Sequence, residues 1–445
     1  MADPTPAIWP VAIAGGGFSG TMLAAQLATL GVRSLIADGS GRIGRGLAYA
    51  TQAPEHLLNV PAAKMSAWPD RPAHFAEWLA AEGLGDPATF ARRRDYGRYV
   101  AAQLDACADI ERVEQDIVSA TRTGNGNGNG WAIRFADGRT EQARVLVLAQ
   151  GNQPPAPLAI AAALPDALIV NDPWSDTARA TFARVAAGGG AVLMLGTGLT
   201  MIDVALSLAA AGHSGPLLAM SRRGLAPRAH GPNTPRTVAA DAIPLGNVLE
   251  LTRWLRVQAA ADGDWRAAVD QLRPHTQAIW RSWDLAQRRR FLRHARPYWD
   301  VHRHRIAPQI AAQVEALREA DQLHSFAGRL LRAEPQGDSV AITIADRGGA
   351  QRTLTVAAIV NCTGPLGDIT RTRDPLLAAL LAAGEVQPDA LSLGLAVDPA
   401  GRAAPGLWAL GPQTKGELWE IVAVPDIRVQ CAAIARTLAH ALEPA

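Results

Sequence analysis

Cysteine is scarce in this chain of 445 residues, and its cysteines are scattered. Cys107, Cys362 and Cys431 lie far apart and form no C-x-x-C pair. This pattern argues against a disulfide framework, a zinc knuckle and a dithiol redox centre. It fits a reducing compartment, so we expect a cytoplasmic protein.

Long apolar runs and a strong charge of one sign are also missing. No apolar run reaches the roughly 18–20 residues that a membrane span needs, and residues 1–10 lack the basic start and apolar core of a secretion signal. Lys and Arg number 43 and Asp and Glu 41, which gives a net charge of +2 and a pI of about 8.6. That balance is too weakly basic to imply nucleic acid, so we expect neither a nucleic-acid nor a membrane partner.

Two glycine-rich turns are the most informative feature that the sequence does contain. The first, at 15–20, follows the apolar run 11–14, and the second, at 196–201, follows the apolar run 191–195. Each turn opens a helix-like stretch, which is the strand–turn–helix pattern of a dinucleotide-binding unit. Two such turns in one chain predict two dinucleotides, a flavin and a nicotinamide, between which electrons can pass.

The first turn has the full G-x-G-x-x-G spacing. Gly15 permits the tight turn, Gly17 leaves room for a pyrophosphate at the helix N-terminus, and Gly20 lets helix and strand pack closely. Asp38, 18 residues after Gly20, stands at the tip of the next expected strand. An acidic residue at this place accepts hydrogen bonds from a ribose.

The second turn is a weaker match, because Met201 replaces the third glycine. The strand expected at 217–220 leads into Arg222 and Arg223 and not into an acid. A carboxylate there would repel a 2′-phosphate, whereas arginine can pair with it. This predicts NADPH, with NADH possible; the alternative is that both arginines are solvated surface charges. The predicted NADPH-binding residues are Gly196, Gly198, Leu199, Thr200, Arg222 and Arg223.

Strand-like segments return after the second turn, which suggests that one domain is inserted into another. We therefore expect an α/β fold with two Rossmann-like, three-layer domains, the NADP domain inserted in the FAD domain, and a helical subdomain. The expected bounds are 1–175 and 326–445 for the FAD domain, 176–240 for the NAD(P) domain and 241–325 for the helical subdomain.

Several short sequence motifs, spread over nearly the whole chain, resemble those of a known family. They are the phrases at 44–49 (GRGLAY), 57–62 (LLNVPA), 196–203 (GTGLTMID), 221–224 (SRRG), 299–305 (WDVHRHR), 418–420 (LWE) and 425–428 (PDIR). The chain resembles the FAD/NAD(P)-binding flavoproteins related to the flavin-containing and N-hydroxylating monooxygenases. That family includes an FAD-dependent urate hydroxylase.

The resemblance implies a set of residues along the flavin. Gly411 matches the glycine of a late flavoprotein motif whose next residue is usually Asp, but here that residue is Pro412. The substitution removes one ribityl contact, while Gly411 can still approach the flavin through its backbone. The implied FAD-binding residues are Gly15, Gly17, Phe18, Ser19, Gly20, Asp38, Arg45, Asn59, Met65, Gly151, Gly364 and Gly411.

The activity implied by the resemblance is an FAD- and NAD(P)H-dependent monooxygenase that uses O₂ to hydroxylate a small polar nitrogen-containing substrate. Urate is the best-defined candidate, and an amine is another. A hydroxylase pocket needs apolar walls that exclude water. The tryptophans of segment 254–299, with Trp419, are candidates for such walls, or they simply fill a helical core.

Two polar groups are candidates for substrate binding. Arg303 and Arg305 belong to a dense cationic patch that could hold an anionic substrate or the NADPH phosphates, or form a structural cluster with Asp300. If this patch is helical, His302 and Arg305 share a face. Trp419 and Glu420 follow Gly411. They either contact the substrate or belong to a surface loop, and the sequence favours neither alternative. We single out no catalytic residue and no metal ligand.

Two other functions remain open: a flavin reductase with a non-oxygen acceptor, and a nucleotide-binding protein without turnover. The lack of a C-x-x-C motif disfavours a disulfide reductase but no other reductase. The complete set of turns argues against a protein without turnover, since such a protein has no need of two cofactors.

Overall fold

The computed structural model describes residues 8–124 and 130–443. Its contacts divide the chain into two compact units, each treated separately below. Unit 1 comprises Met1–Gln52, Val60–Gln153 and Gly367–Ala445, and unit 2 comprises Ala53–Asn59 and Pro154–Leu366. The predicted insertion of one dinucleotide-binding domain into another is confirmed.

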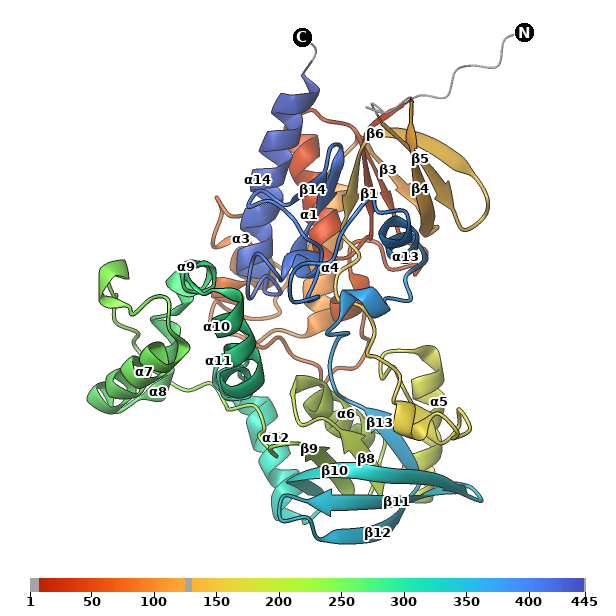
Figure 1. Ribbon diagram of the computed structural model, residues 1–445, viewed down its shortest axis with the longest axis vertical. Helices are drawn as coiled ribbons and strands as arrows, with labels where there is room; N and C mark the ends of the chain where they lie inside the picture. The colour runs from red at the N-terminus through yellow and green to blue at the C-terminus, as the bar shows by residue number, and fades with distance from the viewer. Residues whose placement is uncertain (1–7, 125–129, 444–445) are drawn as a thin grey trace. The chain divides into compact units, whose positions relative to one another are not determined.

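Unit 1 is built on a sheet with the strand order β14-β15-β6-β1-β2-β3, in which β15, β6, β1, β2 and β3 run parallel (Figure 1). The strands β4 and β5 join it as an antiparallel pair alongside β6. The strands are β1 (Trp9–Ala14), β2 (Ser34–Ala37), β3 (Ile110–Val113), β4 (Ile117–Thr123), β5 (Gly130–Phe135), β6 (Thr140–Leu148), β14 (Arg402–Ala404) and β15 (Leu407–Ala409). The helices are α1 (Phe18–Thr29), α2 (Gly46–Tyr49), α3 (His74–Ala81), α4 (Arg93–Asp105), α13 (Pro375–Ala382) and α14 (Val424–Leu442), with 3₁₀ turns η1 (Ala62–Lys64), η6 (Ile369–Arg371) and η7 (Gly411–Thr414).

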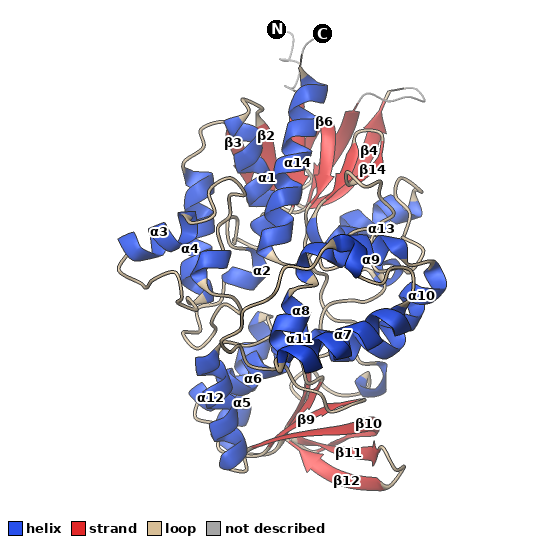
Figure 2. Ribbon diagram, turned by 90° about the vertical axis from the view of Figure 1, so that its left-hand side faces the viewer, coloured by secondary structure: helices blue, strands red, loops and turns tan. Residues whose placement is uncertain are grey.

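Alternate residues of each strand point to opposite faces of this sheet. Helices cover both faces. Ala12, Leu35 and Leu146 lie in one core cluster with Leu376 and Leu380 of α13. On the remaining face α1 packs beside α14, as both ribbon views show (Figures 1 and 2). Unit 1 therefore has the expected layered arrangement.

Unit 2 contains a second sheet with the order β12-β11-β10-β9-β8-β13-β7. The neighbouring strands β10, β9, β8, β13 and β7 run parallel. The strands β11 and β12 extend the sheet beyond β10 as an antiparallel hairpin. The strands are β7 (Ile169–Val170), β8 (Val192–Leu195), β9 (Leu217–Ser221), β10 (Leu323–Gln336), β11 (Ser339–Asp346), β12 (Gln351–Val356) and β13 (Ala358–Asn361). The helices α5 (Asp176–Gly188), α6 (Leu199–Ala210) and α12 (Pro308–Glu319) and the 3₁₀ turn η2 (Ala159–Ala161) accompany this sheet.

A helical insertion follows β9. It contains η3 (Ala240–Ala242), α7 (Val248–Asp262), α8 (Trp265–Asp270), η4 (Arg273–His275), α9 (Thr276–Ser282), α10 (Leu285–Arg290), the π-helical turn η5 (Phe291–Ala295) and α11 (Arg296–Arg303). Trp280 and Trp283 are buried against Phe291, with ring centroids 6.3 and 5.2 Å from its ring. These two tryptophans pack in the core of the insertion, which agrees with the alternative that they fill a helical core.

The predicted domain bounds need correction. Residues 326–366 were expected in the FAD domain, but β10 pairs with β9 and β13 pairs with β8, so this segment lies in unit 2. Residues 154–175 also belong to unit 2, because β7 pairs with β13. These domain bounds depend on strand pairing between segments that are distant in sequence. The local sequence pattern does not reveal which distant strands pair.

Candidate functional site

The first glycine turn joins β1 to α1 and leaves one position open. Gly15 has a φ of +108°, and a Cβ there would lie 2.5 Å from the carbonyl oxygen of Ala149. A Cβ on Gly20 would collide with the carbonyl oxygen of Gly15. By contrast, a Cβ on Gly17 would meet only the Cα of Gly46, at 3.6 Å. Gly15 and Gly20 therefore serve the fold, while Gly17 borders free space.

That space lies over the N-terminus of α1. Gly17 is the N-cap, no side chain caps the helix, and its first turn contains no acidic residue. The first backbone N–H groups of a helix have no intrahelical partner, and the helix dipole adds positive charge there. The turn therefore fits the pyrophosphate of a dinucleotide.

Asp38 is held at the edge of the same turn, directly after β2. Its Oδ2 accepts the N–H of Gly16 at 2.8 Å, and its Oδ1 accepts the N–H of Ser40 at 2.9 Å. A carboxylate oxygen accepts more than one hydrogen bond. The residue can therefore also receive the ribose hydroxyls expected of it.

Unit 1 brings Gly411 next to the start of α1. Gly411 has a φ of +65°, and a Cβ there would lie 2.7 Å from Oγ of Ser19. The N–H of Gly411 donates to Oε1 of Gln430 at 2.8 Å, and Nε2 of Gln430 donates to Oγ1 of Thr414 at 3.2 Å. Gln430 was not predicted from the sequence. It is a polar residue on the otherwise apolar buried face of α14, and this exception to the apolar pattern could have revealed it.

The remaining residues implied along the flavin fall in both units. In unit 1, the carbonyl oxygen of Gly151 accepts Nε2 of Gln413 at 3.2 Å, Met65 is buried, and Arg45 is exposed at the start of α2. Asn59 and Gly364 belong to unit 2. Their contact with the flavin stays a prediction.

The second turn forms a similar cradle in unit 2. Gly196 has a φ of +114°, and Gly198 is the N-cap of α6, which no side chain caps. A Cβ on Gly198 would meet no atom within 4 Å. Met201, at the position of the missing third glycine, is completely buried. The missing glycine therefore does not disturb the turn, which again fits a pyrophosphate.

The two arginines after β9 differ in their surroundings. Arg222 is exposed. Arg223 is half-buried and donates to the carbonyl oxygens of Arg293 and His294 at 3.2 and 3.1 Å. The sequence left open that both arginines are solvated surface charges. The exposed Arg222 agrees with that alternative, whereas the hydrogen bonds of Arg223 hold its side chain in one position.

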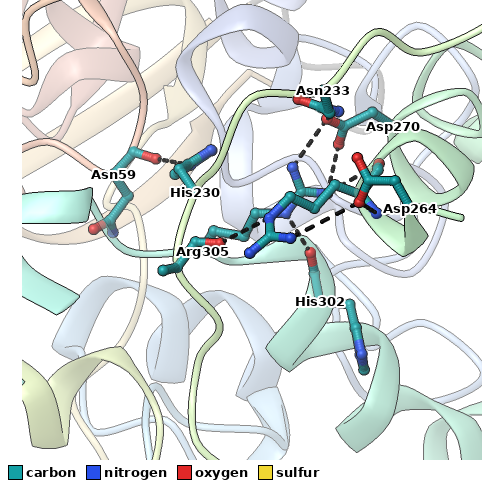
Figure 3. A network of polar contacts seen from close by, with 9 residues as sticks. Asn59, His230, Asn233, Asp264, Asp270, His302 and Arg305 are labelled. Atoms are coloured by element: carbon teal, nitrogen blue, oxygen red, sulfur yellow. Dashed lines mark hydrogen bonds and ion pairs between the residues drawn. The ribbon is translucent and has the colours of Figure 1, made fainter. Parts of the chain in front are cut away.

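Arg305 corrects the predicted substrate contact, because it is buried and fully engaged (Figure 3). Its side chain is 2% exposed, and its Nη1 and Nη2 each donate to the carboxylate of Asp270 at 2.9 Å. Its Nε donates to the carbonyl oxygen of His302 at 2.8 Å. The helix α11 ends at Arg303, so the expected shared helical face of His302 and Arg305 does not exist. All three guanidinium nitrogens are thus engaged within the protein, which argues against the predicted substrate contact.

The same network fixes the segment that follows β9. Asn233 donates to Oδ2 of Asp270 at 2.8 Å, and Arg266 donates to the carbonyl oxygen of Ala229 at 3.2 Å. Nε2 of His230 lies 2.8 Å from the carbonyl oxygen of Asn59 (Figure 3). In parallel sheets ligands bind at the carboxyl ends of the strands, so this segment borders the expected nicotinamide nucleotide site.

The other predicted substrate residues remain predictions. Arg303 is half-buried at the end of α11, and Asp300 pairs with Arg296 at 3.2 Å. Trp419 and Glu420 are buried, and Glu420 has a φ of +70°. A non-glycine residue in this region of φ stores strain, which often marks functional sites.

The three cysteines form no redox pair. All of them are free, and Cys362 and Cys431 are buried. Burial raises the pKa of both thiols well above the ordinary value. Neither is a reactive thiolate.

Two further kinds of site are missing from the described ranges 8–124 and 130–443. No group of three or more His, Cys, Asp or Glu side chains there could hold a metal ion. Within these ranges no helix is long and apolar enough to cross a membrane.

Comparison with known proteins relates one part of the chain to a family and the whole chain to a fold. Residues 12–153 match the FAD-NAD(P)-binding family. A search of curated proteins found no match.

Among solved structures, ornithine hydroxylase from Pseudomonas aeruginosa is 18% identical, with a TM-score of 0.68 over 98% of this chain and 100% of that one. L-Lysine 6-monooxygenase from Pseudomonas syringae is 20% identical, with the same score and coverage. Ornithine N-hydroxylase from Kutzneria sp. 744, determined with reduced FAD, NADP⁺ and L-ornithine, is 16% identical, again with a TM-score of 0.68 and the same coverage. Residues 12–153 thus match the FAD-NAD(P)-binding family, and the whole chain has the two-domain α/β fold of these solved structures.

Proposed function

We propose that this protein is an FAD- and NADPH-dependent monooxygenase that hydroxylates a nitrogen atom of a small substrate. One observation carries the proposal: each unit contains a strand–glycine turn–helix cradle whose helix N-terminus has no side-chain cap. Two cradles of this kind accommodate two dinucleotides. The match of residues 12–153 to the FAD-NAD(P)-binding family supports FAD at the first cradle.

The residues of unit 1 have distinct roles toward the flavin. The N–H groups at the start of α1 bind the pyrophosphate, Asp38 binds the ribose, and the backbone of Gly411 approaches the flavin from the side of Ser19. A bound flavin supplies hydride acceptance and the activation of O₂.

The residues of unit 2 hold the nicotinamide nucleotide. The N–H groups at the start of α6 bind its pyrophosphate, and Arg222 and Arg223 pair with the 2′-phosphate. The ion pair of the buried Arg305 with the half-buried Asp270 keeps the neighbouring segment at 228–233 in place. The preference for NADPH over NADH thus depends on the two arginines.

Amines are the first substrates to test, followed by urate. Proteins with this fold include an ornithine hydroxylase, a lysine 6-monooxygenase and a cadaverine monooxygenase. At 12–20% identity these names suggest substrates to screen and do not decide among them.

A dithiol reductase is the weaker alternative. The fold is also similar to thioredoxin reductase from T. acidophilum, with a TM-score of 0.54 and 12% identity. The chain has no two neighbouring cysteines, and Cys362 and Cys431 are buried. A reductase that passes electrons to another acceptor would still fit both cradles.

The deciding experiment measures O₂ uptake and NADPH oxidation by the flavin-loaded protein. Ornithine, lysine, cadaverine and urate are added one at a time, and the hydroxylated product is identified by mass spectrometry. We expect one of these substrate classes to stimulate both rates and to yield a product one oxygen atom heavier.

Anaerobic acceptors provide the matched control. NADPH oxidation that needs a quinone or dye, and that no amine or purine accelerates in air, would support the reductase. A protein that binds no FAD would contradict both functions.

A further inference from the structure

A π-helical turn and a proline interrupt the regular hydrogen bonding of the helical run from α10 to α11. The N–H of Arg296 donates to Phe291, five residues back, which makes the π-helical turn η5. Pro297 has no N–H, so the carbonyl of Arg293, four residues before it, loses its usual helical donor. A free carbonyl of this kind needs a partner from elsewhere in the structure.

Arg223 supplies that partner. Its Nη2 donates to the carbonyl oxygen of Arg293 at 3.2 Å, and its Nη1 donates to that of His294 at 3.1 Å. Its guanidinium also lies 5.1 Å from the ring centre of Tyr298. A guanidinium has more N–H donors than these two bonds use. Arg223 is therefore fixed in position and still able to bind an anion, with little further loss of side-chain freedom.

The turn that anchors Arg223 also carries positive charge. Arg290 and Arg293 are exposed, and so is Arg222 after β9. Across the described part of the chain, no carboxylate forms an ion pair with any of these three side chains. Positive charge thus gathers at the carboxyl end of β9, where a 2′-phosphate is expected.

An exposed aromatic ring completes this place. Tyr298 is 53% exposed, although Arg223 covers part of its ring. Aromatic rings exposed beside a phosphate site are platforms for a stacked base. The cations and the ring together match a phosphorylated adenosine.

We propose that the π-helical turn η5 and the start of α11 complete the binding site for the 2′-phosphoadenosine end of NADPH. Arg293 binds the 2′-phosphate together with Arg222 and Arg223, and Tyr298 stacks on the adenine. The inference rests on the proposed function, because it assumes that unit 2 binds a nicotinamide nucleotide. It assigns the helical insertion a role in choosing the nucleotide.

The test measures binding of two probes to the flavin-loaded, full-length protein by isothermal titration calorimetry. The probes are adenosine 2′,5′-bisphosphate and AMP, which differ only in the 2′-phosphate. We expect Arg293→Ala to weaken binding of the bisphosphate about tenfold and to leave binding of AMP unchanged, because the backbone carbonyl that anchors Arg223 remains. Tyr298→Leu should weaken both probes by a similar factor, and Tyr298→Phe should restore both.

Arg256→Ala is the matched control, because it removes an exposed arginine from α7 in the same helical insertion. If the Arg293 and Arg256 variants bind the bisphosphate equally weakly, Arg293 contributes to binding only through the net charge of the protein. The proposal is then wrong. If Arg222→Ala lowers the preference for the bisphosphate but neither the Arg293 nor the Tyr298 variant has an effect, the inference fails while the proposed function stands. If the unmodified protein binds neither probe, the nucleotide site in unit 2 fails as well.

Discussion

At the scale of single residues, the glycines of the first turn have two different duties. A Cβ on Gly20 would collide with the carbonyl oxygen of Gly15, so this glycine is needed for folding. A Cβ on Gly17 would meet only the Cα of Gly46, at an ordinary contact distance of 3.6 Å. The structure thus separates a glycine that packing requires from one that borders open space.

Replacing Gly17 by Ala should therefore remove FAD without unfolding the protein. The added methyl group enters the space expected for the pyrophosphate, and we expect FAD affinity to fall at least tenfold while the melting temperature of the flavin-free protein changes little. Flavin absorbance after desalting and calorimetry of the apoprotein measure the two effects. Gly20→Ala is the contrasting variant and should lower soluble yield. Equal flavin content in Gly17→Ala and unmodified protein would refute this placement of the pyrophosphate.

At the scale of elements, buried polar contacts attach the helical insertion to the segment after β9. The chain at 228–230 pairs with the chain at 301–306 through backbone hydrogen bonds from Arg228, His230 and Ile306. The Arg305–Asp270 pair lies beside this bridge and adds Asn233 to it. An ion pair of this kind fixes one arrangement of the elements more than it adds net stability.

Removing one partner of that pair should cost far more than removing both. We expect Asp270→Ala to destabilise unit 2 by about 3–5 kcal/mol, because it leaves the buried guanidinium of Arg305 without a counter-charge. The double variant Asp270→Leu/Arg305→Met should recover much of this loss. Denaturant unfolding gives the energies, and hydrogen exchange should show the earliest opening at 228–233. A single variant as stable as the unmodified protein would show that the pair is not buried in solution.

At the scale of the whole molecule, each unit contains its own glycine turn at an uncapped helix N-terminus. The sheet of unit 1 places Gly17 at the end of β1, and the sheet of unit 2 places Gly198 at the end of β8. Neither cradle takes its glycines from the other unit. Binding at the two turns should therefore be separable by mutation.

Replacing Gly198 by Ala should affect the nicotinamide nucleotide alone. No atom lies within 4 Å of the added Cβ, so we expect full FAD content and unchanged unfolding, but at least tenfold weaker NADP⁺ binding. Calorimetric titration with NADP⁺ and flavin absorbance measure the two effects, and Gly17→Ala should give the opposite pattern. Loss of FAD in Gly198→Ala would mean that the second turn also holds the flavin.

The two cradles could be predicted from sequence because their signals are local. Each depends on an apolar strand, a few glycines and a helix that follow one another within about a dozen residues, where backbone geometry leaves little choice. Asp38 was predictable for the same reason, and the structure holds its carboxylate on the turn.

Arg305 was misjudged because its partner, Asp270, is 35 residues away in sequence and only the tertiary structure brings the two together. Gln430 escaped notice because its contact with Gly411 joins a helix and a turn that the sequence does not relate. Isolated polar residues carry no local pattern that reveals a distant partner.

The sequence by itself determined that this protein has two strand–glycine turn–helix units and that one domain interrupts another, because glycine spacing and apolar periodicity are properties of neighbouring residues. Only the tertiary structure decided where β10 to β13 belong, and it alone showed that Arg305 is buried while Arg223 is anchored. The physical reason is that strand pairing, burial and charge pairing depend on which distant segments meet.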